Sequence, residues 1–443
     1  MNTQLKHYLK KILRQGFGYS KIYKDLQKSQ YFSREQLDEL QNQKLRKIIY
    51  HCYKNVPYYT DLFNNLNLKP EDITTKEDLA KLPFLDKYIV KENFDKLIAK
   101  NKFRFLSYET KTSGTTGTPG RIVWDKISLD YEYAVVDRFY KNSGDNNAKR
   151  VVLRGYLIKP VGDNTPPFWK LNSINNELIM SSYHFNNETS KLYIEKIQEF
   201  NPQIIYAYPS TAYLLAKYLK NSDKKLSIKA IFTSSETLTA DKRAFIEEIY
   251  QCTVYDWYGQ VERVSAIGQC IQGTYHIQED YSITELVETD LGTEIVGTQL
   301  HNYTMPLIRY KTTDTVQLNP IDYKCPCGCN FRSVSKILGK SSSYYHIVTK
   351  DGAKVTSFGY IPMGVENIIE TQFVQEKIGE LIINVTTNGN FSEKDKNKLI
   401  KNTLEHTSED MNVIVNEVTE IPRGPNGKFV SVINKLMKDN NEK

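Results

Sequence analysis

One stretch of the chain, residues 112–119, combines hydroxyl side chains with two glycines. It reads Thr-Ser-Gly-Thr-Thr-Gly-Thr-Pro. Glycine lets a backbone approach an anion closely and turn several N–H groups towards it, and serine and threonine add hydroxyl donors. The pattern therefore predicts a loop that holds phosphate groups. The later Gly339-Lys340-Ser341 is no P-loop of the Walker type, because that motif needs glycine at position 334, which is valine.

Cysteine and histidine residues form a second candidate site. Cys270 and His276 are followed, about fifty residues later, by the pair Cys325 and Cys327. Thiolate and imidazole are the ligands that Zn²⁺ prefers, four to a closed tetrahedral site. We predict a structural zinc site on these four residues, with Cys329 as an alternative to Cys327. The competing interpretation is a group of free thiols beside an ordinary histidine.

Composition indicates an ordinary globular protein. The chain is 40% hydrophobic and 25% charged, as is usual for globular proteins. Its length of 443 residues suggests two to four structural units. The net charge of +7 is spread along the chain, whereas a nucleic-acid binder more often has a concentrated basic stripe. No signal peptide or membrane-spanning run is visible, so we expect a cytoplasmic protein.

The first residues form a short basic amphipathic pattern. Apolar residues fall on one helical face with lysines and an arginine around it; these are Leu5, Tyr8, Leu9, Ile12 and Leu13, flanked by Lys6, Lys10, Lys11 and Arg14. Such a helix either packs on the neighbouring domain, which we expect, or rests weakly on a membrane surface.

The elements that must position these residues follow an α/β pattern. Residues 1–100 are typical of helices, with Pro70 and Pro83 as breakers. Short apolar strands are predicted at 151–155, 204–208 and 230–234, and helices at 212–219 and 240–250. Strands that alternate with helices favour a parallel sheet.

From about residue 280 the pattern changes to short strands, predicted at 281–287, 293–300 and 315–318. The last hundred residues predict a small α+β domain, with a helix at 364–372, a strand at 381–387, a helix at 393–405 and a strand at 412–417. We therefore expect a large α/β domain over 1–338, with a helical lead-in over 1–100 and a β-rich part over 265–335. A smaller, mobile domain over 339–443 follows.

Six motifs resemble, in order, those of the adenylate-forming superfamily, which holds acyl-CoA synthetases, adenylation domains and luciferases. They lie at residues 113–119, 234–236, 258–262, 308–314, 339–340 and 423–428. Each is weak alone, but six in the family order are not expected by chance. Further segments resemble the branch of phenylacetate-CoA ligases, coenzyme F390 synthetases and CapK-type capsule proteins; these are 56–59, 151–155, 206–210, 305–310 and 325–328.

The resemblance implies a fold, a reaction and roles for residues. The fold is the large α/β domain with a small mobile lid domain, and the reaction is attack of a carboxylate on the α-phosphate of ATP. Glu262 would hold Mg²⁺, Asp314 the ribose hydroxyls, and Lys428 would bring a positive charge to the reacting groups. The implied ATP-binding residues are Ser113, Gly114, Thr115, Thr116, Gly117, Arg121, Ser235, Glu236, Tyr258, Gly259, Asp314 and Lys340. Thr116 joins Lys428 and Glu262 as a catalytic residue. The implied acid pocket includes Tyr208, Pro209, Ser234 and Trp257. Members of this branch also resemble the chain in the Cys and His positions of the predicted zinc site.

Two departures from the family pattern bear on function. The family's Pro-Lys is Pro119-Gly120-Arg121 here, so Arg121 is expected to supply the charge. The hinge reads Gly-Lys-Ser-Ser-Ser over 339–343, without the usual arginine and acidic residues. Lysine lacks arginine's rigid fork, which predicts weaker contacts with the ribose. The missing acidic residue predicts a different domain rotation for the second half-reaction, which puts the thioester step, and therefore CoA as acceptor, in question.

These observations favour an AMP-forming ligase that activates a carboxylic acid and passes it to an amine or to CoA, in assembly of a surface polysaccharide. An aryl-acid CoA ligase and a non-catalytic nucleotide-binding relative are the alternatives. A nucleic-acid binder would require strongly salt-dependent binding of oligonucleotides. The sequence leaves the acid, the acceptor and the oligomeric state open.

Overall fold

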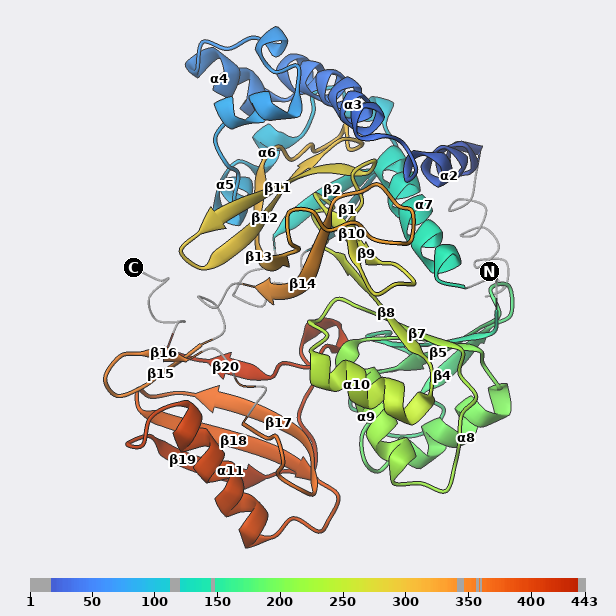
Figure 1. Ribbon diagram of the computed structural model, residues 1–443, viewed down its shortest axis with the longest axis vertical. Coiled ribbons are helices and arrows are strands. Elements are labelled where there is room, and N and C mark those ends of the chain that lie inside the picture. Colours follow the sequence, from blue (N-terminus) through green and yellow to red (C-terminus); the bar gives the residue numbers. More distant parts are fainter. Residues whose placement is uncertain are drawn as a thin grey trace. The chain divides into compact units, whose positions relative to one another are not determined.

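The computed structural model describes residues 17–111, 120–144, 148–340, 346–355, 358 and 361–436 (Figure 1). Its contacts divide the chain into two compact units. Unit 1 comprises Met1–Ala148, Asn172–Asn175 and Tyr255–Gly339, and unit 2 comprises Lys149–Leu171, Asn176–Val254 and Lys340–Lys443. The domain boundary at 338/339 stays a prediction.

Three predicted segments lie outside the described residues. They are the amphipathic pattern at 5–14, the phosphate loop at 113–117 and the hinge serines at 341–343. Among the helices that are described, none combines the length and apolar character needed to cross a membrane.

The helical lead-in of unit 1 is confirmed over the described part of residues 1–100. Helix α3 begins with a capping box, in which Ser33 and Gln36 bond each other's backbone N–H groups. Its inner face buries Leu45, Ile48 and Ile49. The helices of unit 1 are α2 (Phe17–Ser29), α3 (Arg34–Asn55), α4 (Pro57–Asn65), α5 (Lys87–Glu92), α6 (Phe94–Leu97) and α7 (Lys126–Asn142), with 3₁₀ turns η1 (Pro70–Asp72), η2 (Lys76–Lys81) and η3 (Lys102–Arg104).

The strands of unit 1 form a mainly antiparallel sheet and a separate hairpin. In the hairpin, β1 (Ser107–Lys111) pairs with β2 (Arg121–Asp125) on either side of the phosphate-loop segment. The sheet has the order β11 (Ser282–Thr289), β12 (Gly292–Gln299), β13 (Tyr310–Leu318), β14 (Ser333–Lys340), β10 (Tyr275–Ile277), β9 (Ala266–Gln269) and β8 (Thr253–Gly259). The β-rich part predicted after residue 265 is therefore confirmed.

Unit 2 begins with an α/β layer. Strand β3 (Arg150–Arg154) pairs in parallel with β5 (Glu177–Ser181) and β6 (Ile204–Ala207), and β6 pairs in parallel with β7 (Ala230–Ser234). Strand β4 (Trp169–Asn172) follows β5 in the sheet order. Helices α8 (Ser190–Phe200), α9 (Pro209–Lys220) and α10 (Ala240–Tyr250) pack with these strands around one apolar core. The predicted parallel strands and their helices are confirmed.

The last part of unit 2 is a four-stranded sheet with the order β19 (Asn412–Glu417), β18 (Glu380–Thr387), β17 (Ile368–Gln375) and β20 (Val432–Asn434). Helix α11 (Glu393–His406) lies against it (Figure 1). Leu399 of this helix is buried with Leu381, Ile383 and Val385 of β18. Two short strands, β15 (Ile347–Val348) and β16 (Lys354–Val355), and a 3₁₀ turn, η4 (Pro425–Gly427), complete the unit.

The helix predicted at 364–372 is wrong, because most of that segment belongs to strand β17. Ile368 through Gln375 read Ile-Ile-Glu-Thr-Gln-Phe-Val-Gln, which is rich in β-branched and aromatic residues. The segment pairs antiparallel with β18 and parallel with β20, and Phe373 is buried in their shared core. Pairing between distant strands decided its conformation.

Candidate functional site

Three of the predicted ATP-site residues come together in unit 1. The hydroxyl of Tyr258, on β8, donates to Asp314 Oδ2 at 2.9 Å, and the hydroxyl of Tyr310, on β13, donates to Glu262 Oε1 at 3.1 Å. Burial raises the pKa of Tyr258 well above its ordinary value, and the charge of Asp314 adds to this. The tyrosines therefore stay protonated and orient two carboxylates. Sequence reasoning missed Tyr310, although it lies in the motif at 308–314.

The backbone beside both carboxylates is unusual. Thr313 has φ +62° and Arg263 has φ +55°, in the left-handed region that side chains larger than glycine rarely adopt. The N–H of Thr313 donates to Glu294 Oε1 at 2.9 Å, and the N–H of Asp314 donates to Thr312 Oγ1 at 3.1 Å. Such conformations gather at functional sites and persist only where neighbours hold them.

The other predicted residues of unit 1 are more scattered. Arg121 on β2 forms an ion pair with Glu109 at 2.7 Å and lies over the ring of Phe94 at 4.0 Å. Trp257 is buried on β8, with its ring centroid 5.0 Å from that of Phe139, and Gly259 ends that strand. Their proposed roles towards ATP and the acid stay predictions.

In unit 2, the carboxylate of Glu236 bonds the first turn of the helix that follows the predicted pocket residue Tyr208. Glu236 accepts hydrogen bonds from the N–H of Ser210 at 2.9 Å and from its hydroxyl at 3.0 Å, in the first turn of α9. Pro209 begins that helix and Tyr208 precedes it. The Oγ atoms of Ser234 and Ser235 lie 3.3 Å apart, and Ser235 has φ +73° at a position where the related motif has glycine.

The loop that carries Lys428 docks on these same residues. The hydroxyl of Tyr208 donates to the carbonyl of Asn426 at 2.9 Å, and the N–H of Phe429 donates to Glu236 Oε1 at 3.0 Å. The hydroxyl of Ser182, at the end of β5, donates to the carbonyl of Gly427 at 2.9 Å. The loop that contains Lys428 is therefore fixed on both sides of that residue.

Gly155 makes this docking possible. A Cβ atom placed on it would lie 1.7 Å from the carbonyl oxygen of Asn426, so only glycine lets the two backbones touch. The predicted strand at 151–155 includes Gly155, whereas β3 ends at Arg154. The sequence identified neither Gly155 nor Ser182 as a contact of the loop. Lys340, which the resemblance places in the ATP site, is the last residue of β14.

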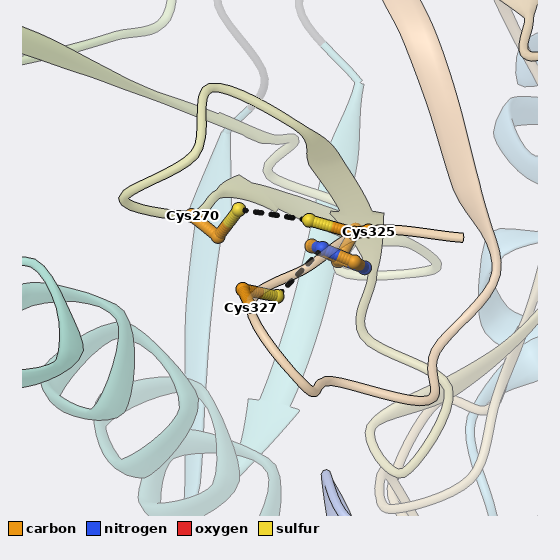
Figure 2. A group of neighbouring side chains, drawn as sticks. Cys270, Cys325 and Cys327 are labelled. Atoms are coloured by element: carbon orange, nitrogen blue, oxygen red, sulfur yellow. Dashed lines mark hydrogen bonds between the residues drawn. The ribbon is translucent and has the colours of Figure 1, made fainter. Parts of the chain in front are cut away.

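The predicted zinc ligands gather in unit 1. One ligand atom from each of Cys270, His276, Cys325 and Cys327 lies within 4.8 Å of the others. Cys270 Sγ is 3.6 Å from Cys325 Sγ, Cys327 Sγ is 3.4 Å from His276 Nε2, and the three cysteine side chains point towards one another (Figure 2). A tetrahedral zinc ion with ordinary bond lengths would place its ligand atoms roughly 3.5–3.8 Å apart.

Groups around the cluster support its four side chains. The N–H groups of Gln272 and Cys329 donate to Cys270 Sγ and Cys327 Sγ, each at 3.4 Å. The second ring nitrogen of His276, Nδ1, lies 3.3 Å from the carbonyl of Phe331. Donors to thiolate sulfur and a carbonyl behind the imidazole are the usual outer partners of a metal site. The donor set therefore fits zinc, with the sulfur of Cys327 in the cluster and the side chain of Cys329 also beside His276.

Known proteins are similar to this chain along most of its length. Protein CapK of Staphylococcus aureus is 28% identical over 412 residues, which cover 90% of each chain. The phenylacetate-coenzyme A ligase of Aromatoleum evansii is 27% identical over 333 residues, covering 72% of this chain and 73% of that protein. Residues 347–435 match the family model of the CapK C-terminal domain.

The fold is that of solved adenylate-forming enzymes. A crystal structure of 2-hydroxyisobutyryl-CoA ligase in the postadenylation state, in complex with 2-HIB-AMP, is 16% identical, covers 93% of each chain and has a TM-score of 0.68. The same ligase in the thioesterification state, with CoA, gives 0.57 over the same share of each chain. Along most of its length the chain is therefore similar in sequence to CapK and to the phenylacetate-coenzyme A ligases, and it has the fold of solved adenylate-forming ligases.

Proposed function

We propose that this protein activates a carboxylic acid with ATP, forming an acyl-adenylate and pyrophosphate, and then transfers the acyl group to an acceptor. The observation that carries the proposal is the pairing of Tyr258 with Asp314 and of Tyr310 with Glu262. It presents two oriented carboxylates from the motifs that the family uses for nucleotide and metal. The similarity to CapK and to phenylacetate-coenzyme A ligase along most of the chain supports the same reaction class.

The chemistry asks the protein mainly to position groups and to stabilise charge. The carboxylate oxygen of the acid bonds to the α-phosphorus, and the bond from that phosphorus to pyrophosphate breaks. Asp314 accepts hydrogen bonds from the ribose hydroxyls, and Lys428 places a positive charge beside the reacting oxygens. Pre-placed charges of this kind are each worth about 10²–10³ in rate.

Glu262 is suited to hold Mg²⁺, because a carboxylate oxygen is the hard ligand that this ion prefers. The ion would neutralise charge on the phosphates. Tyr310 keeps the carboxylate of Glu262 in one orientation through its hydrogen bond. The segment 113–117 and Arg121 complete the proposed phosphate site, with Thr116 among the catalytic residues.

The Cys/His cluster holds a structural zinc ion in this proposal. Four protein ligands leave no open position for a substrate, which is typical of a structural site. The ion would join the loop after β9, strand β10 and the segment before β14. It takes no part in the reaction.

The acceptor is an amine or CoA, and the acid serves the assembly of a surface polysaccharide. The similarity to CapK favours the polysaccharide context, and that to the phenylacetate-coenzyme A ligases favours an aryl acid with CoA. These two versions share the first half-reaction and differ in the acceptor.

The test is release of pyrophosphate from ATP and Mg²⁺ across aryl acids, amino acids and uronic acids, each with and without CoA. We expect release that depends on the acid, and a fall of about 10²–10³ in Lys428→Ala and Glu262→Ala. Lys401→Ala, in an exposed ion pair on α11, is the matched control and should keep full activity.

The outcomes separate the candidates. Dependence on CoA would identify a thioester product, and release without it would favour an amine acceptor. A protein that binds ATP but turns over no acid would behave as a non-catalytic relative. Failure to bind ATP would refute the proposal.

A further inference from the structure

Arg154 carries two buried hydrogen-bond donors that nothing in the described part of the chain accepts. Its Nε and Nη2 atoms are buried, and neither has a hydrogen-bond partner among the described residues. Three other arginines have a buried nitrogen without such a partner, but each has a carboxylate within 4.0 Å; they are Arg34, Arg263 and Arg423. Arg154 is the exception within the described residues.

The two unpartnered atoms lie on the same edge of the guanidinium. That edge grips a carboxylate with two parallel hydrogen bonds, as Arg121 shows in this protein: its Nε and Nη2 bond the two oxygens of Glu109 at 2.7 and 2.9 Å. Arg138, which is fully buried, also binds both oxygens of Asp280, at 2.6 and 2.9 Å. Arg154 is only partly buried, but two donor atoms that are shielded from water cost free energy while they have no acceptor, so an anion from outside the chain is the natural partner of this edge.

The location of Arg154 indicates which molecule brings that anion. It is the last residue of β3, at the carboxyl end of parallel strands, where α/β sheets bind their ligands. Its guanidinium lies 5.9 Å from the ring centroid of Tyr208, which the family resemblance places in the acid pocket. The next residue, Gly155, touches the loop that carries Lys428.

We propose that Arg154 binds a second, non-reacting anionic group of the acid, so that the preferred substrate carries two acidic groups. This inference rests on the proposed function. A fork that engages both oxygens neutralises a carboxylate and lowers its nucleophilicity, which suits a group that must stay unreacted. The fork also discriminates against acids with one charge, because these leave its buried donors unpaired.

The experiment measures binding of matched acids to the full-length protein by calorimetry, without ATP. The pairs are succinate and butyrate, glutarate and pentanoate, and phthalate and benzoate. We expect each dianion to bind about 10- to 100-fold more tightly than its partner. Arg154→Gln should abolish the preference while leaving the monoanions unchanged, and Arg154→Lys, which keeps the charge but not the fork, should retain part of it.

Arg150→Gln is the matched control, because it removes the same charge from the other end of the same strand and should keep the preference. ATP and inorganic phosphate form a second arm. If Arg154→Gln weakens ATP or phosphate and leaves the acids unchanged, the anion is a nucleotide phosphate and the inference is overturned. It is also overturned if the wild-type protein prefers no dianion. Neither result depends on turnover, so pyrophosphate release tests the proposed function separately.

Discussion

The Cys/His cluster of unit 1 and the end of strand β3 in unit 2 both concentrate polar groups, but they differ in what those groups contact. In the cluster, every one of the four ligand atoms lies within 4.8 Å of the other three. At the strand end, two donor atoms of Arg154 have no acceptor among the described residues. Close by, Tyr208, Ser182 and Glu236 bond the loop that carries Lys428.

In our two proposals, the cluster is a site that stabilises the structure and the strand end is a site that binds a ligand. A set of donors that meet at one point can be satisfied by a single ion, and the ion then stabilises the fold. Hydrogen-bond donors that have no acceptor within the protein can instead be satisfied by a ligand that binds reversibly. Three tests address this comparison, beginning with the largest expected effect.

The first test removes a cluster ligand. Cys327→Ser should lose the bound zinc, because serine is a poor ligand for this ion. The free energy of unfolding should fall by about 4 kcal/mol, the stabilisation expected from an ion present at a thousand times its Kd. Metal content by mass spectrometry and denaturant unfolding would measure both changes.

Cys329→Ser and Cys252→Ser are the controls for that test. The backbone N–H of Cys329 donates to Cys327 Sγ and its side chain interacts with His276, but its sulfur is not one of the four grouped ligand atoms; Cys252 lies outside the cluster. Both variants should keep the metal. Retention of zinc by Cys327→Ser together with its loss from Cys329→Ser would show that the ligand set is wrong.

The second test disturbs the contact between Gly155 and the loop that carries Lys428, without changing any residue of the proposed ATP site. Gly155→Ala puts a methyl group 1.7 Å from the carbonyl oxygen of Asn426, so the loop must move. A displacement of about 1 Å at the reacting groups can cost about 10²-fold. We expect pyrophosphate release to fall about 10- to 100-fold, with ATP binding and zinc content unchanged.

Gly162→Ala provides the matched control, because a Cβ atom there meets nothing within 4 Å. It should behave as the wild-type protein. Equal activity of the two alanine variants would mean that the docked loop is not the arrangement used in adenylation.

The third test concerns Lys217, which holds the C-terminal sheet to α9. Its ammonium donates to the carbonyls of Ile368 and Ile369 at 2.7 and 2.8 Å. Burial lowers the pKa of Lys217 from 10.5 to about 8. Between these two values the unfolded chain binds more protons than the folded one, so stability rises with pH.

The free energy of unfolding of the wild-type protein, relative to Lys217→Met, should therefore increase from pH 8 to pH 10.5, by at most about 3 kcal/mol. Lys220→Met, on the same helix and half-exposed, controls for the loss of a surface lysine. A difference that stays flat or falls with pH would contradict the assignment of this contact.

The sequence by itself determined the reaction class and much of the local structure. The motifs that contain Glu262, Asp314 and Lys428 are short, and their chemistry lies in residue types at close spacing. Strands β7 and β19 and helix α10 were predicted with the bounds that the structure has, because hydrophobic period and turn residues act within ten or so residues. The four residues of the Cys/His cluster were also singled out from their types, since thiols and imidazoles at such spacing are typical of a metal site.

Only the tertiary structure decided what distant segments do to one another. Residues 368–375 became a strand because β18 and β20 pair with them, against the helix expected from the local pattern. The same holds for three features of the proposed sites: the hydrogen bond from Tyr310 to Glu262, the contact of Gly155 with Asn426, and the unpartnered donors of Arg154. Each depends on which distant segments of the chain lie side by side, which no local pattern encodes. The physical reason is that a hydrogen-bonding group is satisfied or left vacant by what folding brings beside it.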